Sequence, residues 1–397
     1  MGADYDYLII GAGIVGLSIA YSIQKKNPKA KIAIIEKEVE IGLHASGRNS
    51  GVLHSGFYYG SNTKKAQFTK DGNERMKAFC KEHNLLLNEC GKVVVAKDEK
   101  ELNRLETLFE RGKANGVDVK IIDEAELAKI EPNASTYRKA LYSPTTATVR
   151  PLEVLKKLAS IVKESGARIY TGTKFLYPLG KDRVVTDAGE FKASKVINTA
   201  GLYADRVAQQ FGFGKDYVVV PFKGKYLEYT GDDKPVSTNI YPVPNPLNPF
   251  LGVHYTVKAD GSITLGPSAS PALWRENYKA CSNFDLEEFG ETLWYVAKMF
   301  ILNRSGFRKL AIEECKRFSK GAFQEEAKKL ARHIDTKKFS SWGNAGIRAQ
   351  LVDKRSMTLV DDFIVEGDEK SLHILNAVSP AFTCSFAFAD WIVEKYL

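Results

Sequence analysis

The feature that most constrains this chain is a set of three closely spaced glycines near its beginning. Gly11, Gly13 and Gly16 follow the apolar run YDYLIIG and open IVGLSIAYSIQKK, in which apolar residues recur at helical spacing. A second apolar run, KIAIIEK, contains Glu36 near its end. The order strand, helix, strand, with GxGxxG at the first turn, predicts a Rossmann-like βαβ unit.

The same residues predict a dinucleotide site. Gly11 permits the tight turn, Gly13 lets the backbone approach a diphosphate, and Gly16 lets the helix pack closely on the strand. The diphosphate would lie against the N–H groups that begin the helix. Glu36 follows twenty residues after Gly16, where its carboxylate can accept hydrogen bonds from ribose hydroxyls. A glycine-rich turn that binds nothing is the structural alternative.

Three further segments favour a buried, extended FAD over an exchanging NAD. They are rich in small residues, and two of them run from strand through turn to helix: ASGRNSGVLHSGFYYG, VINTAGLYADRVA and ILNAVSPAFTCSFAFADWI. A prosthetic FAD needs backbone contacts from distant parts of the chain. The expected FAD contacts are Gly11, Gly13, Ile14, Gly16, Glu36, Lys37, His44, Ser46, Arg48, Asn49, Ser50, Phe175, Ala200, Gly201, Ser379, Pro380 and Ala381.

The pattern along the chain predicts an α/β protein in which a Rossmann-like FAD-binding domain is interwoven with an antiparallel-sheet α+β substrate domain. We expect residues 1–80, 145–215 and 338–397 in the FAD-binding domain, and 81–144 and 216–337 in the substrate domain. The pattern over residues 285–337 predicts a helical insertion in the substrate domain. On its first helix, a face made of Phe289, Leu293, Val296 and Phe300 is expected to pack on the core, with membrane docking as the alternative.

Composition excludes some classes of protein. The five cysteines form no CxxC pair or Cys/His cluster, so we expect neither disulfides nor a metal site. The net charge of +9 is spread over scattered lysines, so no nucleic acid is expected. We find no signal peptide or membrane span, and expect a cytoplasmic protein, with peripheral contact at the inner face of the membrane as an option.

Several motifs identify the chain as similar to a known family. GAGIVGLSIA, NSGVLHSGFYY, NTAGLYADR, VPFKGKYLEY, PFLGVHYT, DGSITLGP, GIRAQ and LHILNAVSPA occur in the family's order over nearly the whole chain. They resemble the D-amino-acid-oxidase-like FAD oxidoreductases and, within them, the L-2-hydroxyglutarate dehydrogenases and oxidases. The resemblance implies FAD-dependent oxidation of L-2-hydroxyglutarate to 2-oxoglutarate, with a quinone or oxygen as final electron acceptor.

The resemblance also implies site residues. Arg348, in GIRAQ, is expected to grip the substrate carboxylate, with a surface arginine as the alternative. His54 is expected to act as general base, or to bond to the flavin or backbone instead. His254 is expected in the floor of the pocket, where it binds a substrate carboxylate or packs in the sheet. Some relatives tether FAD to a histidine, whose matching position here lies near Arg48 or Asn49, so non-covalent FAD is expected.

Other assignments stay open at the level of sequence. A second cation for the distal carboxylate could be any of four residues: Lys223, Lys225, Arg48 or Arg275. Four tyrosines are candidates for lining the pocket or for the core: Tyr58, Tyr59, Tyr226 and Tyr255. Alternative functions are oxidation of glycerol 3-phosphate or an amino acid, a flavin-containing RNA-modification protein, and a binding module that has lost its flavin.

Overall fold

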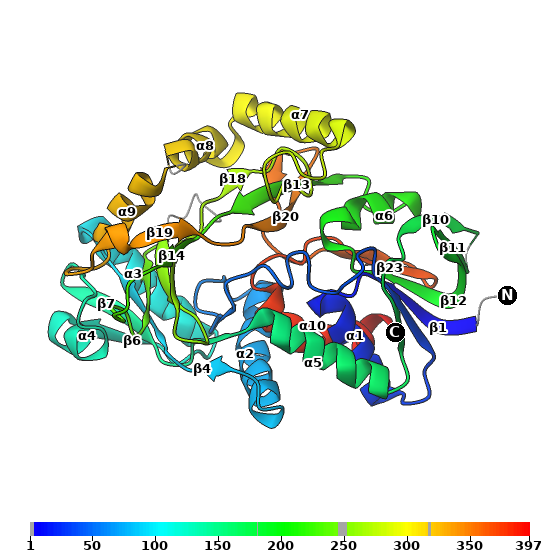
Figure 1. The fold of residues 1–397 in the computed structure, drawn as a ribbon, viewed down its shortest axis with the longest axis horizontal. Coiled ribbons are helices and arrows are strands. Elements are labelled where there is room, and N and C mark those ends of the chain that lie inside the picture. Colours follow the sequence, from blue (N-terminus) through cyan, green and yellow to red (C-terminus); the bar gives the residue numbers. More distant parts are fainter. Residues whose placement is uncertain (1–3, 181, 245–251, 317–318) are drawn as a thin grey trace. The chain divides into compact units, whose positions relative to one another are not determined.

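The computed structural model describes residues 4–180, 182–244, 252–316 and 319–397 (Figure 1). The chain divides into two compact units. Unit 1 comprises Met1–Asn49, Pro151–Pro221 and Arg348–Leu397, and unit 2 comprises Ser50–Arg150 and Phe222–Ile347. The expected α/β class is confirmed, because unit 1 is built on a largely parallel sheet and unit 2 on a mixed one.

The central sheet of unit 1 runs β10-β11-β12-β1-β2-β9, and β23 pairs with β12 as well as with β22. Strands β23, β12, β1, β2 and β9 are parallel neighbours. Their bounds are β1 Asp4–Ile10, β2 Ile32–Ile35, β9 Arg168–Tyr170, β10 Phe175–Leu179, β11 Arg183–Thr186, β12 Gly189–Asn198, β22 Val365–Gly367 and β23 Ser371–Ile374. Both sides of such a sheet are covered in α/β proteins, which explains why β2 is a continuous buried apolar run.

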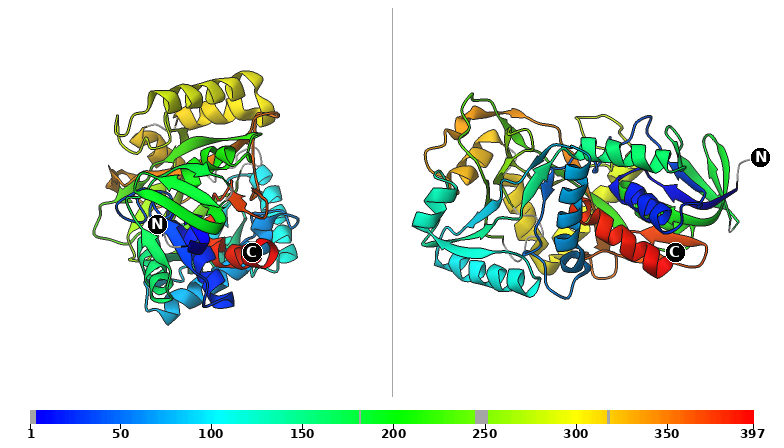
Figure 2. Two further views of the ribbon diagram at one scale, coloured as in Figure 1. Left: turned by 90° about the vertical axis from the view of Figure 1, so that its right-hand side faces the viewer. Right: turned by 90° about the horizontal axis from the view of Figure 1, so that it is seen from below.

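Three helices of unit 1 pack together: α1 Ile14–Lys26, α5 Pro151–Glu164 and α10 Ala381–Tyr396. Figure 2 shows α10, in red, beside α1, in blue. Both α1 and α10 are buried over most of their length, as expected of helices that cover a parallel sheet. The remaining elements of this unit are the short η1 Gly201–Tyr203, α6 Ala204–Gln210 and β21 Thr358–Leu359.

Unit 2 is built on a second sheet, in the order β19-β14-β17-β16-β15-β5-β7-β6. The expected antiparallel sheet is found except at its centre, where β5 and β15 pair in parallel. Its strands are β5 Lys92–Val95, β6 Lys120–Asp123, β7 Lys139–Ser143, β14 Leu227–Tyr229, β15 Asn239–Pro242, β16 His254–Val257, β17 Ile263–Gly266 and β19 Phe339–Trp342. One face of this sheet packs into an apolar core that includes Val93, Ile240 and Tyr255.

The other elements of unit 2 surround this sheet. They are β3 Val52–Leu53, α2 Lys64–Glu82, β4 Leu87–Asn88, α3 Glu99–Ala114, α4 Glu124–Ile130, β8 Ala147–Val149, β18 Ser270–Pro271, α7 Leu286–Leu302, η2 Arg304–Gly306, α8 Phe307–Lys316, α9 Lys320–Lys328 and η3 Thr336–Lys338. Strands β13 Tyr217–Gly224 and β20 Gly346–Asp353 are each divided by the unit boundary.

The unit boundaries differ from the expected domains. Residues 50–80 and 145–150 were expected with the nucleotide-binding part, yet they belong to unit 2 because β3 and β4 both pair with β8. Residues 338–347 also belong to unit 2, because β19 pairs with β14, whereas 216–221 belong to unit 1. Short strands leave little pattern in the local sequence, so only their hydrogen-bonded pairing shows to which unit they belong. Residues 245–251, which include the start of the PFLGVHYT motif, lie outside the described residues.

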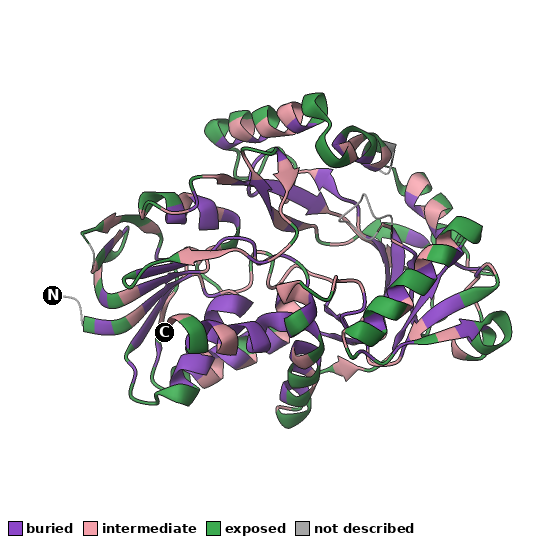
Figure 3. Cartoon of the chain, turned by 180° about the vertical axis from the view of Figure 1, so that it is seen from behind, coloured by how far each residue is buried: buried purple, intermediate pink, exposed green. Residues whose placement is uncertain are grey.

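The expected core face of α7 is wrong. Phe289 and Val296 are half-buried, whereas Leu293 and Phe300 are exposed, and the buried positions are Glu288, Thr292 and Met299. In Figure 3 most of α7 is green and pink. Because α7 is apolar on more than one side, spacing alone could not identify the side that faces the protein.

Candidate active site

The glycine turn of unit 1 has the geometry that a dinucleotide site requires. Gly11 adopts φ +104°, and a side chain there would place Cβ 2.7 Å from the carbonyl oxygen of Thr199. A Cβ on Gly16 would lie 2.2 Å from the Gly11 carbonyl oxygen. The turn and the close packing of α1 on β1 therefore exclude side chains at both positions.

Ser46 and Glu36 support this turn. The Ser46 hydroxyl accepts a 2.9 Å hydrogen bond from the backbone N–H of Ile14, the first residue of α1. The Glu36 carboxylate directly follows β2 and accepts backbone hydrogen bonds from Ala12 and Glu38, each of 3.1 Å. A helix N-terminus and a carboxylate thus lie at one turn, as the diphosphate and ribose of a dinucleotide require.

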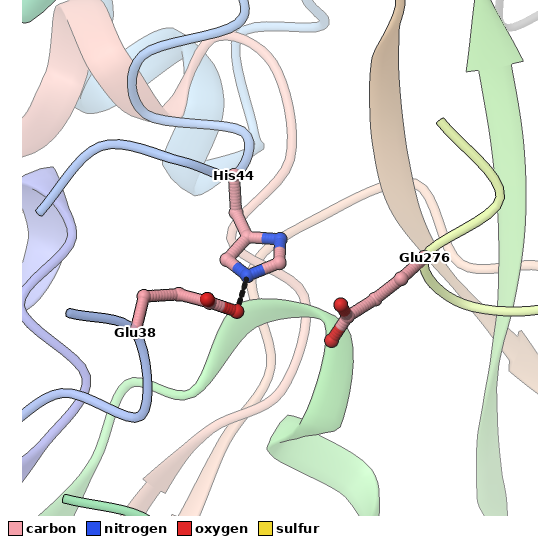
Figure 4. A group of neighbouring side chains, drawn as sticks. All are labelled: Glu38, His44 and Glu276. Carbon is pink, nitrogen blue, oxygen red and sulfur yellow. Dashed lines mark hydrogen bonds and ion pairs between the residues drawn. The ribbon is translucent and has the colours of Figure 1, made fainter. Parts of the chain in front are cut away.

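Lys37 and His44, both expected to contact the cofactor, converge on Glu38. Figure 4 shows the contact between His44 and Glu38. The Glu38 carboxylate accepts a 2.8 Å hydrogen bond from His44 Nε2 and also binds the Lys37 ammonium. Burial opposes ionisation of Glu38, but these two hydrogen bonds outweigh it and hold the pKa of Glu38 below its ordinary value. Sequence reasoning missed Glu38, because only the fold of the following loop brings His44 back to it.

The other expected FAD contacts of unit 1 fall at three places. Arg48 and Asn49 belong to the loop after β2, where their side chains donate to backbone carbonyls of Leu43, Ala45 and Ser46. Ala200 precedes η1 and Gly201 is its first residue. Ser379 and Pro380 precede α10, and Ala381 is its first residue.

Two of these expected contacts differ from the rest. The Phe175 ring stacks on Phe211, with 5.9 Å between ring centroids and 21° between planes, so its side chain belongs to the core of unit 1. Ser50 is the first residue of unit 2.

In unit 2, strand pairing puts three polar side chains on one face of the sheet. Val94 pairs with Tyr241, and Ile240 pairs with Tyr255, which places Tyr241 opposite His254. Paired residues share a face, and so do residues two apart along a strand. Lys92, Tyr241 and His254 therefore lie together, on the face opposite the apolar core that holds Tyr255.

His254 is held neutral in this face. Its ring stacks on Tyr241, with 3.7 Å between centroids and 20° between planes. Desolvation is the main cause that lowers the pKa of His254 to about 3, and the Lys92 charge adds to it. Nδ1 lies 2.8 Å from the Gly252 carbonyl oxygen, which only accepts, so Nδ1 carries the hydrogen and Nε2 the lone pair. At neutral pH the ring is therefore uncharged and offers Nε2 as an acceptor, which favours the alternative of packing in the sheet over the expected contact with a substrate carboxylate.

His54 lies in the segment that follows β3 and is buried. The side-chain amide of Asn73, on α2, donates hydrogen bonds of 3.0 and 3.2 Å to the carbonyl oxygens of Leu53 and His54. These bonds fix the backbone that carries the imidazole. Asn73 is a supporting residue that no sequence motif signals.

Lys92, which sequence reasoning also missed, is fully buried at the start of β5. Its ammonium lies over three rings, at 4.2 Å from the Tyr241 centroid, 5.2 Å from Tyr58 and 5.8 Å from Phe57. Desolvation lowers the pKa of Lys92 to about 7. The sequence feature that could have identified Lys92 is its position in the otherwise apolar run KVVV.

Arg348 is half-buried on β20, in unit 1. Two of the other expected cations have partners in unit 2: Lys223 donates a 2.6 Å hydrogen bond to Asn277, and Arg275 lies 3.3 Å from the Glu291 carboxylate. Lys225 lies 5.6 Å above the Trp342 ring. Among the tyrosines, Tyr255 packs in the apolar core and three are half-buried: Tyr58, Tyr59 and Tyr226.

Comparison with known proteins agrees with this geometry. The family model described as "FAD dependent oxidoreductase" matches residues 6–395. An L-2-hydroxyglutarate dehydrogenase of Indibacter alkaliphilus is 36% identical over 99% of this chain and 100% of its own length. The L-2-hydroxyglutarate dehydrogenase of Escherichia coli K12 is 34% identical, over 98% and 93%. The mitochondrial L-2-hydroxyglutarate dehydrogenase of Caenorhabditis elegans is 36% identical, also over 98% and 93%.

Solved structures share the fold. The L-alpha-glycerophosphate oxidase of Mycoplasma pneumoniae, solved with FAD bound, has a TM-score of 0.75 at 21% identity over 99% of this chain and 94% of its own. The glycine oxidase of Geobacillus kaustophilus has a TM-score of 0.73 at 17% identity, over 99% and 94%. With the full-length family match and the glycine turn of unit 1, these findings show that the chain belongs to the family of FAD dependent oxidoreductases and that its dinucleotide is FAD.

Proposed function

We propose that this enzyme oxidises L-2-hydroxyglutarate to 2-oxoglutarate. The observation that carries the proposal is its similarity, over nearly the full length of both chains, to L-2-hydroxyglutarate dehydrogenases of bacteria and animals. The glycerophosphate and glycine oxidases share the fold at much lower identity, so they do not favour their own substrates here.

The reaction converts a secondary alcohol into a ketone. Bound FAD supplies a two-electron acceptor for the hydride that leaves when the bond between Cα and its hydrogen breaks. The hydroxyl proton goes to a base as the carbon–oxygen double bond forms. One hydride and one proton leave the substrate, and both carboxylates stay unchanged. The protein must therefore hold the carboxylates, orient Cα and accept the proton.

We assign these tasks to the residues expected from sequence. Arg348 binds the carboxylate next to the reacting carbon, since a guanidinium matches a carboxylate with two hydrogen bonds. His54 accepts the hydroxyl proton. His254, whose pKa near 3 makes it a weak base, offers its neutral Nε2 as a hydrogen-bond acceptor that orients the hydroxyl. FAD is bound without a covalent link, through the glycine turn and Glu36.

We further propose a quinone as electron acceptor, reached by peripheral contact with a membrane surface. No helix in the described ranges is long and apolar enough to cross a membrane. The support comes from large apolar side chains exposed on α7, namely Leu286, Leu293, Trp294, Ile301 and Leu302. Exposed Arg304, Arg308 and Lys309 follow directly, as suits an anionic lipid surface.

Anaerobic mixing of the FAD-loaded protein with candidate substrates tests the main proposal. We expect L-2-hydroxyglutarate to bleach the yellow flavin absorbance with stoichiometric formation of 2-oxoglutarate, while D-2-hydroxyglutarate, glycerol 3-phosphate and L-amino acids do not. Bleaching by one of these others, with none by L-2-hydroxyglutarate, would refute it. Reoxidation by a soluble quinone analogue, compared with reoxidation by oxygen, tests the acceptor.

A further inference from the structure

Lys92 is a buried cation with no polar partner among the described residues. Its ammonium nitrogen is fully buried and makes no hydrogen bond to them, and no carboxylate contributes to its pKa. Ring faces attract an ammonium group, but they do not replace the hydrogen bonds that it forms in water. An ammonium group in this position is therefore suited to an anionic partner.

A second buried polar atom without a partner lies beside the ammonium group. The Tyr58 hydroxyl is buried without a hydrogen-bond partner among the described residues, and the Tyr58 ring is one of the three beneath the ammonium. Two buried polar atoms left unsatisfied side by side require an explanation, and a bound ligand supplies one.

We propose that Lys92 binds the distal carboxylate of the substrate and thereby selects dicarboxylic 2-hydroxy acids over monocarboxylic ones. This inference rests on the proposed function and assigns the second cation that the sequence left open. Lys223 and Arg275 are occupied by Asn277 and Glu291, whereas the ammonium of Lys92 is not.

The rings around Lys92 also suggest how a carboxylate reaches it. Phe57 and Tyr241 are almost fully buried, whereas Tyr58 is half-buried and follows directly after the buried segment that carries His54. In this proposal, a turn of the Tyr58 side chain would expose the ammonium group and bring the Tyr58 hydroxyl, which has no partner among the described residues, to the same carboxylate. The charge of Lys92 and the hydrogen bond from Tyr58 would then both act on the distal carboxylate.

Binding should therefore be linked to proton uptake. The pKa of Lys92 is lowered to about 7 by desolvation, and the titratable groups that face it are Cys90, Tyr58, Tyr241 and His254. None of these is a carboxylate. A bound carboxylate raises the pKa of Lys92, so above pH 7 binding takes up a proton.

The first experiment compares two substrates that differ only at the distal end, L-2-hydroxyglutarate and L-2-hydroxybutyrate. In the FAD-loaded Lys92→Met variant we expect kcat/KM for L-2-hydroxyglutarate to fall about a hundredfold or more, mainly through KM, while that for L-2-hydroxybutyrate changes less than about threefold. Lys120→Met, an exposed lysine on β6 of the same sheet, is the matched control and should change neither. Equal losses for both substrates, or no loss, would overturn the assignment.

The second experiment does not require turnover. Calorimetric titration with glutarate, in buffers of different ionisation enthalpy, should show uptake of up to one proton above pH 7 in the wild type and loss of both binding and uptake in Lys92→Met. If glutarate binds in this way but L-2-hydroxyglutarate does not reduce the flavin, the proposed reaction fails and the Lys92 site stands. Binding of glutarate that is unchanged in Lys92→Met, or absent from the wild type, overturns the site.

Discussion

Among single residues, the buried charge of Lys92 destabilises the folded chain, and this should appear in the pH dependence of the free energy of unfolding. Its pKa is about 7 in the folded chain against an ordinary value of 10.5. The unfolded chain binds more protons between these values, so the free energy of unfolding rises with pH across this window. Below it, both states are protonated and the folded state carries the full cost of the buried charge.

Lys92→Met should remove this dependence and increase the free energy of unfolding below pH 7 by about 1–4 kcal/mol, because a buried charge gives way to an apolar group of similar length. Urea unfolding on both sides of the window measures it. Parallel curves for variant and wild type would contradict the pKa assigned to Lys92. A variant that is more stable but loses its substrate is typical of a functional position.

Arg348 permits a second prediction at this scale. Arg348→Ala should raise KM for L-2-hydroxyglutarate about a hundredfold, because a carboxylate loses its cationic partner, while the protein keeps its bound FAD. Steady-state kinetics and the flavin spectrum measure the two effects. Arg355→Ala, at a site that is 79% exposed and paired with Asp216, is the control and should leave KM unchanged. An unchanged KM in Arg348→Ala would remove this residue from the site.

At the scale of elements, the contact between β1 and α1 depends on glycine. A methyl group at Gly16 would lie 2.2 Å from the Gly11 carbonyl oxygen and 2.7 Å from Thr199 Oγ1. We expect Gly16→Ala to lose about 1–3 kcal/mol of folding free energy and to bind FAD weakly, because the helix must move away from the strand. Thermal unfolding and flavin content report both effects.

Gly290→Ala provides the opposite control. Gly290 lies inside α7, and an added Cβ there meets nothing within 4 Å. Alanine should therefore stabilise the protein by about 0.5–1 kcal/mol, the ordinary difference between the two residues in a helix. If both substitutions had the same effect, packing at Gly16 would not be the reason for its glycine.

At the scale of the whole molecule, the exposed face of α7 predicts binding to lipid. Trp294 and Ile301 are 64% and 71% exposed. A variant carrying both Trp294→Asp and Ile301→Asp should lose binding to phosphatidylglycerol vesicles at least about tenfold and keep its activity with a soluble acceptor. Sedimentation with vesicles measures this binding. Val39→Asp, which replaces an exposed apolar residue of unit 1, should bind as the wild type does. Equal binding by all three proteins would exclude α7 as the contact.

The nucleotide-binding turn is a local feature of the chain. GxGxxG, the helix after it and Glu36 lie within one short stretch of chain, so spacing alone predicted which backbone had to come close to a diphosphate. Three further segments rich in small residues added FAD, and the family motifs, which span nearly the whole chain, added the class of reaction. The structure confirms the β1-α1-β2 unit at the expected place.

The grouping of Lys92, Tyr241 and His254 in unit 2 depends on which strands pair. Lys92 stands on β5, far in the sequence from Tyr241 on β15 and His254 on β16, and only the parallel pairing of β5 with β15 brings it beside them. The charge of His254 followed from the same arrangement, because burial and the neighbouring lysine lower its pKa. Local periodicity describes which side of a strand is buried, but it carries no information about which strand lies beside it, and here that neighbour makes the site.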